Sequence, residues 1–155
     1  RHNRPMDVLP YERTHKDACL ALFDSNLPEF FATNERPDFA SFLEAPAYPY
    51  WVLQHESAIV AGGGFEVLDA QHRARLHWGM VHRDWHRKGL GRFLLLYRLR
   101  EIGRIAGIDV VEVGTSPLSA PFFEKEGFRT LTVEKDGWGE GLDRVEMIKK
   151  LTVCT

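Results

Sequence analysis

The sequence predicts an α/β fold built on a mixed, mostly antiparallel sheet of about seven strands with about four helices. The first observation behind this prediction is the order of segments: strand, helix, short helix, three strands, helix, strand, helix and two strands. The second is how the strands are joined. Tight turns connect some strands and helices separate others, so antiparallel hairpins and parallel crossovers should occur together.

The first half of the chain is expected to contribute four strands and two helices. Thr14 is predicted to cap a helix of residues 14–23, and a short helix is predicted at residues 38–44, after Pro37. The turn at residues 55–57 should join two antiparallel strands. The strands are predicted at residues 6–10, 50–54, 58–67 and 76–81.

The second half should start with a long helix from about residue 89 to 106, stopped by Gly107. Apolar residues in it recur at helical spacing, which predicts one buried stripe. A short helix is predicted at residues 119–126, and residues 136–141 are expected to form a glycine-rich loop. The remaining strands are predicted at residues 110–113, 131–133 and 145–148.

Composition excludes several functional classes. The 155 residues are 44% hydrophobic and 27% charged, as expected for one globular domain, which we place at residues 6–152 after a loose tail at residues 1–5. The net charge of −2 gives no global case for binding nucleic acid or a membrane. The two cysteines form no Cys-x-x-Cys pair, so we expect a cytoplasmic protein without a metal.

The most informative motif is the run His86-Arg87-Lys88-Gly89-Leu90-Gly91, between a predicted strand and the long helix. The first turn of a helix has unpaired amide donors and the positive end of the helix dipole. Glycines let the backbone approach a ligand, so such a turn binds phosphate or pyrophosphate, and Arg92 adds charge there. The run matches neither a Walker loop nor the Gly-x-Gly-x-x-Gly dinucleotide fingerprint.

Two motifs together resemble a known family. The first run is similar to the Gln/Arg-x-x-Gly-x-Gly/Ala signature of the GNAT superfamily of N-acetyltransferases, with His86 at its first position. Residues 116–128 resemble the family's Asn-x-x-Ala-x-x-x-Tyr-x-x-x-Gly-Phe segment, and the order of elements matches over nearly the whole chain. The resemblance implies an acetyltransferase that uses acetyl-CoA, with splayed central strands holding the pantetheine arm.

The resemblance also implies which residues contact the coenzyme. They are Met80, Val81, His86, Arg87, Lys88, Gly89, Leu90, Gly91, Arg92, Ser116 and Phe123. The main-chain amide near Met80 is implied as the donor that polarises the acetyl carbonyl and stabilises the oxyanion.

The catalytic base departs from the family pattern. The family often has a glutamate six residues before Val81, where this chain has Arg75, and arginine cannot act as a base at neutral pH. His77 should lie on the same face of the strand, and an imidazole has a pKa of about 6.5. We therefore predict His77 as the base, with Glu35 and Glu112 as alternatives; a packing role for His77 is the competing interpretation.

The catalytic acid departs as well. The family often uses a tyrosine at the position of Phe123 to protonate the leaving thiolate, and phenylalanine has no proton to give. Ser116, Thr115 or water could take this role. Because coenzyme A thiolate is a good leaving group, activity need not depend on an acid. A catalytically weak acyl-CoA-binding sensor is therefore an alternative function.

In the family, the first two helices and the last strand pair shape the acceptor site. The residues predicted to bind the acceptor are Phe30, Phe31, Glu35, Trp78, Trp138 and Asp143. Aromatic rings beside carboxylates suit a cationic amine with an apolar body, although the same rings also suit a packed core. We predict direct attack of a small-molecule primary amine on acetyl-CoA in a ternary complex. Acetylation of a protein N-terminus or lysine is the alternative, and the resemblance allows a homodimer.

Overall fold

The computed structural model describes residues 6–68 and 72–151 and confirms the predicted mixed sheet. Its seven strands lie in the order β1-β2-β3-β4-β5-β7-β6. The pair β4–β5 is parallel, and the other five pairs are antiparallel. The strands are β1 (Asp7–Pro10), β2 (Tyr50–His55), β3 (Ala58–Leu68), β4 (Arg73–Val81), β5 (Val110–Thr115), β6 (Arg129–Gly139) and β7 (Leu142–Lys150).

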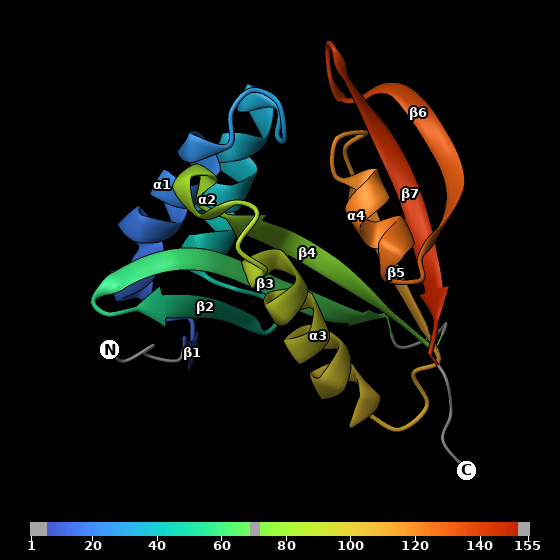
Figure 1. Ribbon diagram of the computed structural model, residues 1–155, viewed down its shortest axis with the longest axis horizontal. Helices are drawn as coiled ribbons and strands as arrows, with labels where there is room; N and C mark the ends of the chain where they lie inside the picture. Colours follow the sequence, from blue (N-terminus) through green and yellow to red (C-terminus); the bar gives the residue numbers. More distant parts are fainter. Residues whose placement is uncertain (1–5, 69–71, 152–155) are drawn as a thin grey trace.

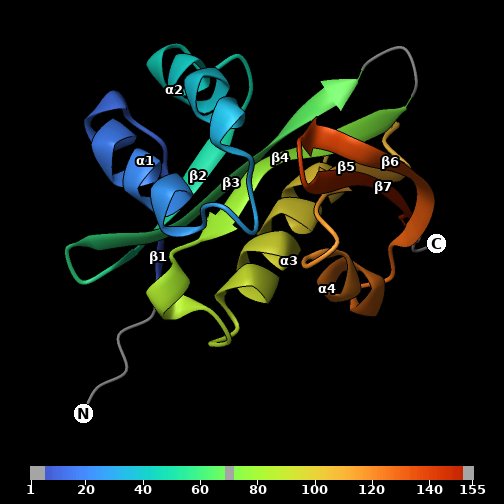
Figure 2. The same ribbon diagram turned by 90° about the horizontal axis from the view of Figure 1, so that it is seen from above.

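Four helices cover the two faces of this sheet. They are α1 (Lys16–Ser25), α2 (Arg36–Glu44), α3 (Leu90–Gly103) and α4 (Ala120–Lys125). Helices α1 and α2 lie on one face, and α3 and α4 lie on the other (Figure 1, Figure 2). Each layer has a fully buried apolar core, with Phe23 and Phe39 against β2 on the first face and Leu95 and Ile102 against β4 and β5 on the second.

The centre of the sheet is splayed, as predicted. Strands β4 and β5 pair only over residues 73–76 and 110–113. Beyond that point β4 continues against β3 up to Val81, whereas β5 continues against β7 up to Thr115. In Figure 1 the β6–β7 hairpin leans away from β4 above the junction. The two halves of the sheet therefore form a V that leaves one edge of β4 unpaired.

Strand β4 also carries a bulge beside this V. Gly62 pairs with Met80 and Gly64 pairs with His77, so two residues of β4 lie opposite the single residue between the glycines. Trp78 adopts a left-handed conformation there, with φ of 51°. Its carbonyl accepts a hydrogen bond of 2.9 Å from Tyr50 Oη, which fixes the bulge from β2, on the far side of β3.

Two predicted helix boundaries are wrong. Helix α1 begins at Lys16 with His15 as its N-cap, because a 3₁₀ turn at Arg13–His15 precedes it, and Thr14 is not the cap. Helix α3 ends at Gly103 and does not reach residue 106, because glycine is a weak helix former. Gly107, with φ of 90°, lies in the turn that leads into β5.

The predicted loop at residues 136–141 is also wrong. Strand β6 extends to Gly139 and pairs there with Leu142, so a short turn joins two long strands. The Asp143 carboxylate accepts a 2.9 Å hydrogen bond from the Asp136 amide, which helps to hold this end of the hairpin. The predicted tail at residues 1–5, residues 69–71 and the predicted domain end at residue 152 lie outside the described residues.

Within residues 6–68 and 72–151, every helix is too short or too polar to cross a bilayer.

Candidate functional site

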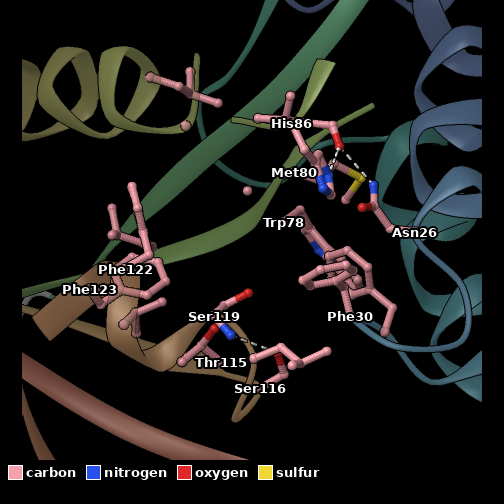
Figure 3. Close-up of a pocket in the computed structure, with 18 of the residues that line it drawn as sticks. Asn26, Phe30, Trp78, Met80, His86, Thr115, Ser116, Ser119, Phe122 and Phe123 are labelled. Atoms are coloured by element: carbon pink, nitrogen blue, oxygen red, sulfur yellow. Dashed lines mark hydrogen bonds between the residues drawn. The ribbon is translucent and has the colours of Figure 1, made fainter. Parts of the chain in front are cut away.

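A cavity of about 720 Å³ fills the V and reaches the start of α3. Figure 3 looks into it, with Asn26, Phe30 and Met80 on one side and Ser116 and Phe123 on others. It is lined by sixteen of the residues predicted from the sequence: Phe30, Phe31, Glu35, His77, Trp78, Met80, Val81, His86, Arg87, Gly89, Leu90, Gly91, Arg92, Ser116, Phe123 and Trp138. The structure therefore brings most of the predicted site together.

One end of the cavity is the segment His86–Arg92, which we call the cradle. Gly89 is the N-cap of α3, with φ of 82°, and a Cβ at this position would meet no atom within 4 Å. The first turn of α3 contains no acidic side chain, and its N-cap Gly89 has no side chain that could cap the first amides. Its first amides therefore point into open space with the positive end of the helix dipole, as phosphate binding requires.

Charged side chains surround the cradle unevenly. Arg83, Arg87 and Arg92 line the cavity, and the Arg92 Nε lies 3.1 Å from a carboxylate oxygen of Glu126. Lys88, which we predicted to contact the coenzyme, lies outside the cavity lining and over the Trp85 ring, 5.9 Å from its centroid. The positive charge on this rim suits a polyanionic ligand.

The histidine that begins the cradle has an intramolecular partner. His86 Nε2 lies 2.9 Å from the Val81 carbonyl, and its ring packs edge-on against Phe30. The buried amide of Asn26 donates to the same carbonyl at 2.9 Å, as the dashed lines in Figure 3 show. Asn26, which no sequence motif singled out, thus ties the end of α1 to the end of β4.

The directions of the β4 peptide groups differ along the V. The His82 amide donates to the Val60 carbonyl of β3, at 2.8 Å. Peptide groups of alternate residues point to the same neighbour in an antiparallel ladder. Met80, two residues earlier, therefore directs its amide toward β3, whereas the peptide groups of Val81 point into the V.

The bulge frees a further amide. Because the Trp78 carbonyl points toward Tyr50, the N–H of the same trans peptide unit, which belongs to Gly79, points the opposite way. Gly79 is exposed to the cavity, whereas Met80 is buried. The structure therefore offers the Gly79 amide, and not the Met80 amide, as a donor on the inner edge of β4.

The opposite wall comes from β5 and α4. Ser116 is buried, and its hydroxyl accepts a 3.3 Å hydrogen bond from the Ser119 amide, so it helps to start α4. Phe123 packs edge-on against Phe122 and Phe128, in the apolar part of this wall. Apolar rings at this position suit the uncharged pantetheine part of a coenzyme.

His77 lies on β4 beyond the junction of the V. Its Nε2 is 3.0 Å from a carboxylate oxygen of Glu66, and its ring stacks on Tyr48 with 4.8 Å between centroids. Burial lowers the pKa of His77, although the hydrogen bond to Glu66 opposes this effect. A neutral ring that donates from Nε2 to Glu66 has its lone pair on Nδ1 and can accept a proton there.

Glu35 is the one carboxylate among the described residues that line the cavity. It lies in the turn before α2, and its carboxylate accepts a 2.8 Å hydrogen bond from the Ala32 amide. Burial raises the pKa of Glu35, and the Ala32 hydrogen bond only partly opposes it. Glu35 therefore has the environment of a proton acceptor.

Arg75 and Glu112 form a structural network where the V begins. Arg75 makes two 3.0 Å bonds to the Glu146 carboxylate and one of 2.9 Å to Glu112. Glu112 also accepts from Arg73, at 3.1 Å. Two arginines thus occupy the Glu112 carboxylate, which makes it a weaker candidate for the base than His77 or Glu35.

The acceptor side is less acidic than predicted. We call residues 30–35 together with residues 138–144 the acceptor wall. Trp138 belongs to it and donates from Nε1 to the Thr115 carbonyl, at 3.0 Å. Asp143 does not line the cavity, because its carboxylate holds the hairpin instead.

The comparisons with known proteins agree with this geometry. The sequence matches the model of the Acetyltransferase (GNAT) domain family over residues 24–151. The chain belongs to the GNAT family of acetyltransferases. Membership in this family confirms the predicted acyltransferase, with acetyl-CoA as its cosubstrate. No curated protein sequence matches significantly.

Solved structures show that the GNAT fold extends over nearly the whole chain. The ribosomal-protein-S18-alanine N-acetyltransferase from Escherichia coli is 19% identical, with a TM-score of 0.78 and 97% of each chain covered. A putative acetyltransferase from Salmonella typhimurium, determined with acetyl-CoA, is 19% identical, with a TM-score of 0.73 and 98% of this chain and 97% of that chain covered. At these identities the likeness concerns the fold alone.

No group of three or more His, Cys, Asp or Glu side chains in the described part of the chain is arranged to hold a metal ion.

Proposed function

We propose that this GNAT protein transfers an acetyl group from acetyl-CoA to a primary amine of a small molecule, within a ternary complex. The observation that carries the proposal is the continuity of one cavity from the cradle, through the V, to the acceptor wall. A long ligand with a phosphate end and an uncharged arm fits this path, with its reactive end between the walls. The acceptor can then enter from the opposite side.

The donor that stabilises the oxyanion is, in this proposal, the Gly79 amide. The sequence pointed to the amide near Met80, but the strand register turns that amide toward β3. The Gly79 amide points away from Tyr50, and Gly79 is exposed in the cavity lining, which supports it as the donor. A fixed amide aimed at the acyl oxygen stabilises negative charge there at no reorganisation cost during the reaction.

His77 is the proposed general base. An ammonium acceptor must lose a proton before its nitrogen can attack the acyl carbon. The ammonium first loses one proton to solvent. As the C–N bond forms and the C–S bond breaks, a second proton passes from nitrogen to Nδ1 of His77, directly or through water, and coenzyme A leaves as the thiolate. Glu66 supports this role because its bond to Nε2 favours the tautomer with a free Nδ1.

The acceptor wall favours a small acceptor over an extended polypeptide. A Cβ at Gly139 would lie 3.1 Å from the Ala32 Cβ and 3.3 Å from an Asn34 side-chain oxygen. The end of β6 therefore contacts the turn before α2, across the acceptor side of the V. Phe31 and Trp138 line this part of the cavity beside Glu35, which suits an amine with an apolar or aromatic body.

The experiment has a binding stage and a turnover stage. Calorimetry should detect binding of CoA and acetyl-CoA to the full chain. Release of free thiol should then be measured with arylalkylamines, aliphatic monoamines, polyamines and peptides that carry a free N-terminus or lysine. We expect faster turnover with arylalkylamines than with peptides.

The outcomes separate the alternatives. Failure to bind CoA would overturn the proposal. Turnover on peptides alone would replace the small-molecule acceptor with a protein acceptor. Tight CoA binding without turnover on any amine would indicate an acyl-CoA sensor.

A further inference from the structure

Helix α3 carries a buried arginine that the proposed reaction has not used. Arg98 is 4% exposed and lines the cavity. Its Nη1 donates to the Gly64 carbonyl at 3.1 Å, and its Nε donates to the Leu94 carbonyl over a longer 3.5 Å. Its Nη2 donates to no atom of the residues that the structure describes. The guanidinium is therefore held in place by two bonds while one end stays available.

The neighbouring strands leave room for this side chain. A Cβ at Gly63 of β3 would lie 3.0 Å from the Arg98 Cζ, and a Cβ at Gly79 of β4 would lie 2.9 Å from Nη2. The first distance is tighter than most Cβ contacts, and the second is shorter than real Cβ contacts, so a side chain at either position would displace the guanidinium. The glycines thus admit the guanidinium to the bulge, beside the amide that we proposed as the oxyanion donor.

Arg98 has no ionic partner in its surroundings. Across residues 6–68 and 72–151, no carboxylate oxygen lies within 4 Å of its nitrogens, although every other buried or half-buried arginine on the cavity's acceptor side is paired. Burial lowers the pKa of Arg98 to about 10, so it is still a cation at neutral pH. A buried cation without a counter-ion is costly, and an anion at its free end would offset that cost.

We infer that Arg98 donates from Nη2 to the acyl oxygen and acts as a second oxyanion donor beside the Gly79 amide. The inference rests on the proposed acyl transfer. The nitrogen and Cβ of one residue are about 2.5 Å apart, so Nη2 lies at most about 5.4 Å from the Gly79 nitrogen. One oxygen can lie about 2.9 Å from both donors at that separation.

The phosphates of the coenzyme do not explain this arginine. Arg98 follows Leu90 by eight residues, which is about 12 Å along the helix axis, so the cradle holds the phosphates more than two turns away. Negative charge develops on the acyl oxygen only when the amine attacks. An unpaired, fixed cation at that place therefore stabilises the transition state more than the bound thioester. This difference lowers the activation free energy and raises kcat.

The test uses hydroxylamine as acceptor, because it is largely neutral at pH 7 and needs little of the acceptor wall. Its nitrogen attacks the acyl carbon, the C–S bond breaks, the proton from nitrogen goes to solvent, and acetohydroxamate and CoA form. Arg98→Met should lower kcat about 10²-fold and leave the Kd for CoA within twofold. Arg100→Met is the matched control, because Arg100 lies exposed on the same helix over Tyr97.

A conservative variant separates catalysis from packing. Arg98→Lys should keep most of the rate near pH 7 and lose it relative to the wild type as pH rises, because burial lowers the pKa of a lysine. Tyr50 and His77 are the titratable neighbours of Arg98. Because the wild type contains both, the rate of the variant is compared with the wild-type rate at each pH. This pH-dependent loss also serves as the readout if Arg98→Met does not fold.

The two failures are distinguishable. If the wild type binds acetyl-CoA but does not accelerate hydroxamate formation, the proposed function fails, and this inference fails with it. If the wild type is active and Arg98→Met keeps its kcat, only the second donor is overturned. An Arg98→Lys rate ratio that stays constant with pH would likewise overturn it.

Discussion

The cradle and the acceptor wall line the same cavity but are built in different ways. The cradle is one continuous segment, His86–Arg92, whose binding groups are backbone amides at a helix start. The acceptor wall joins side chains from distant parts of the chain, such as Glu35 and Trp138. A backbone site depends little on its neighbours, whereas a side-chain site depends on tertiary packing. Changes in the cradle should therefore alter coenzyme affinity, and changes near the acceptor should alter turnover.

The largest expected effect on turnover comes from His77→Gln. Losing a general base costs about 10² or more in rate, so kcat should fall by that factor while the Kd for CoA stays unchanged. Burial lowers the pKa of His77 below the usual histidine value of about 6.5. The wild-type rate should therefore fall with decreasing pH only below that value. Steady-state rates from pH 5 to 9 would reveal this acid limb, which the variant should lack.

Glu35→Gln, compared with His77→Gln, tests which of the two residues is the general base. Burial raises the pKa of Glu35 above the usual carboxylate value of about 4.3. If Glu35 were the base, the rate would therefore begin to fall with decreasing pH above that value. We expect Glu35→Gln to raise the acceptor KM and to keep the pH profile of the wild type. If the acid limb disappears in Glu35→Gln and persists in His77→Gln, the base belongs to the acceptor wall and not to β4.

The second effect tests the cradle. Gly89→Asp should weaken CoA binding about 10²-fold, because the new carboxylate competes for the helix amides and repels the phosphates. At saturating acetyl-CoA, kcat should stay near the wild-type value. Isothermal titration calorimetry gives the affinity.

A second glycine supplies the control for Gly89→Asp. Gly141, at φ 83°, has the same left-handed conformation and the same open surroundings, but it lies in the β6–β7 turn. Gly141→Asp should therefore cost a similar backbone strain of about 1 kcal/mol and leave CoA binding unchanged. Equal losses of affinity in both variants would show that strain, and not the cradle, is responsible.

The contrast between the two regions also explains what the sequence could predict. The cradle was predictable because glycines, basic residues and a helix start are local signals. The splayed sheet followed from the family resemblance, since no local pattern shows where β4 and β5 stop pairing. Asp143 was misplaced because the prediction treated residues 136–141 as a loop, and the structure extends β6 through them to Gly139.

Arg98 shows what sequence reasoning missed and the signal that could have found it. It lies four residues from both Leu94 and Ile102, on the buried face of α3. Helical spacing alone places this charged residue among apolar ones on one face of the helix, which is an unusual pattern that can be detected in the sequence. Its meaning could not be predicted, because the two glycines that admit it belong to β3 and β4.

The third effect concerns the junction on which both regions depend. Arg75 joins β4 to β5 and β7 through Glu112 and Glu146, and its side chain is 22% exposed. Removing one partner of a largely buried pair leaves charges uncompensated, so Arg75→Met should lower the free energy of unfolding by about 2 kcal/mol. Urea denaturation measures this loss. Arg73→Met is the control, and its more exposed pair should cost less than about 1 kcal/mol.

The smallest effect sharpens the comparison on the acceptor side. Trp138→Phe keeps an aromatic ring in the cavity but removes the hydrogen bond to the Thr115 carbonyl, which is worth about 1 kcal/mol. Because this bond holds the hairpin against β5, the acceptor KM should rise about threefold to fivefold, with CoA affinity unchanged. Asp143→Asn should leave both constants unchanged, since Asp143 is outside the cavity lining. A larger change in CoA affinity than in acceptor KM for Trp138→Phe would mean that the hairpin positions the coenzyme, so that the two regions do not act separately.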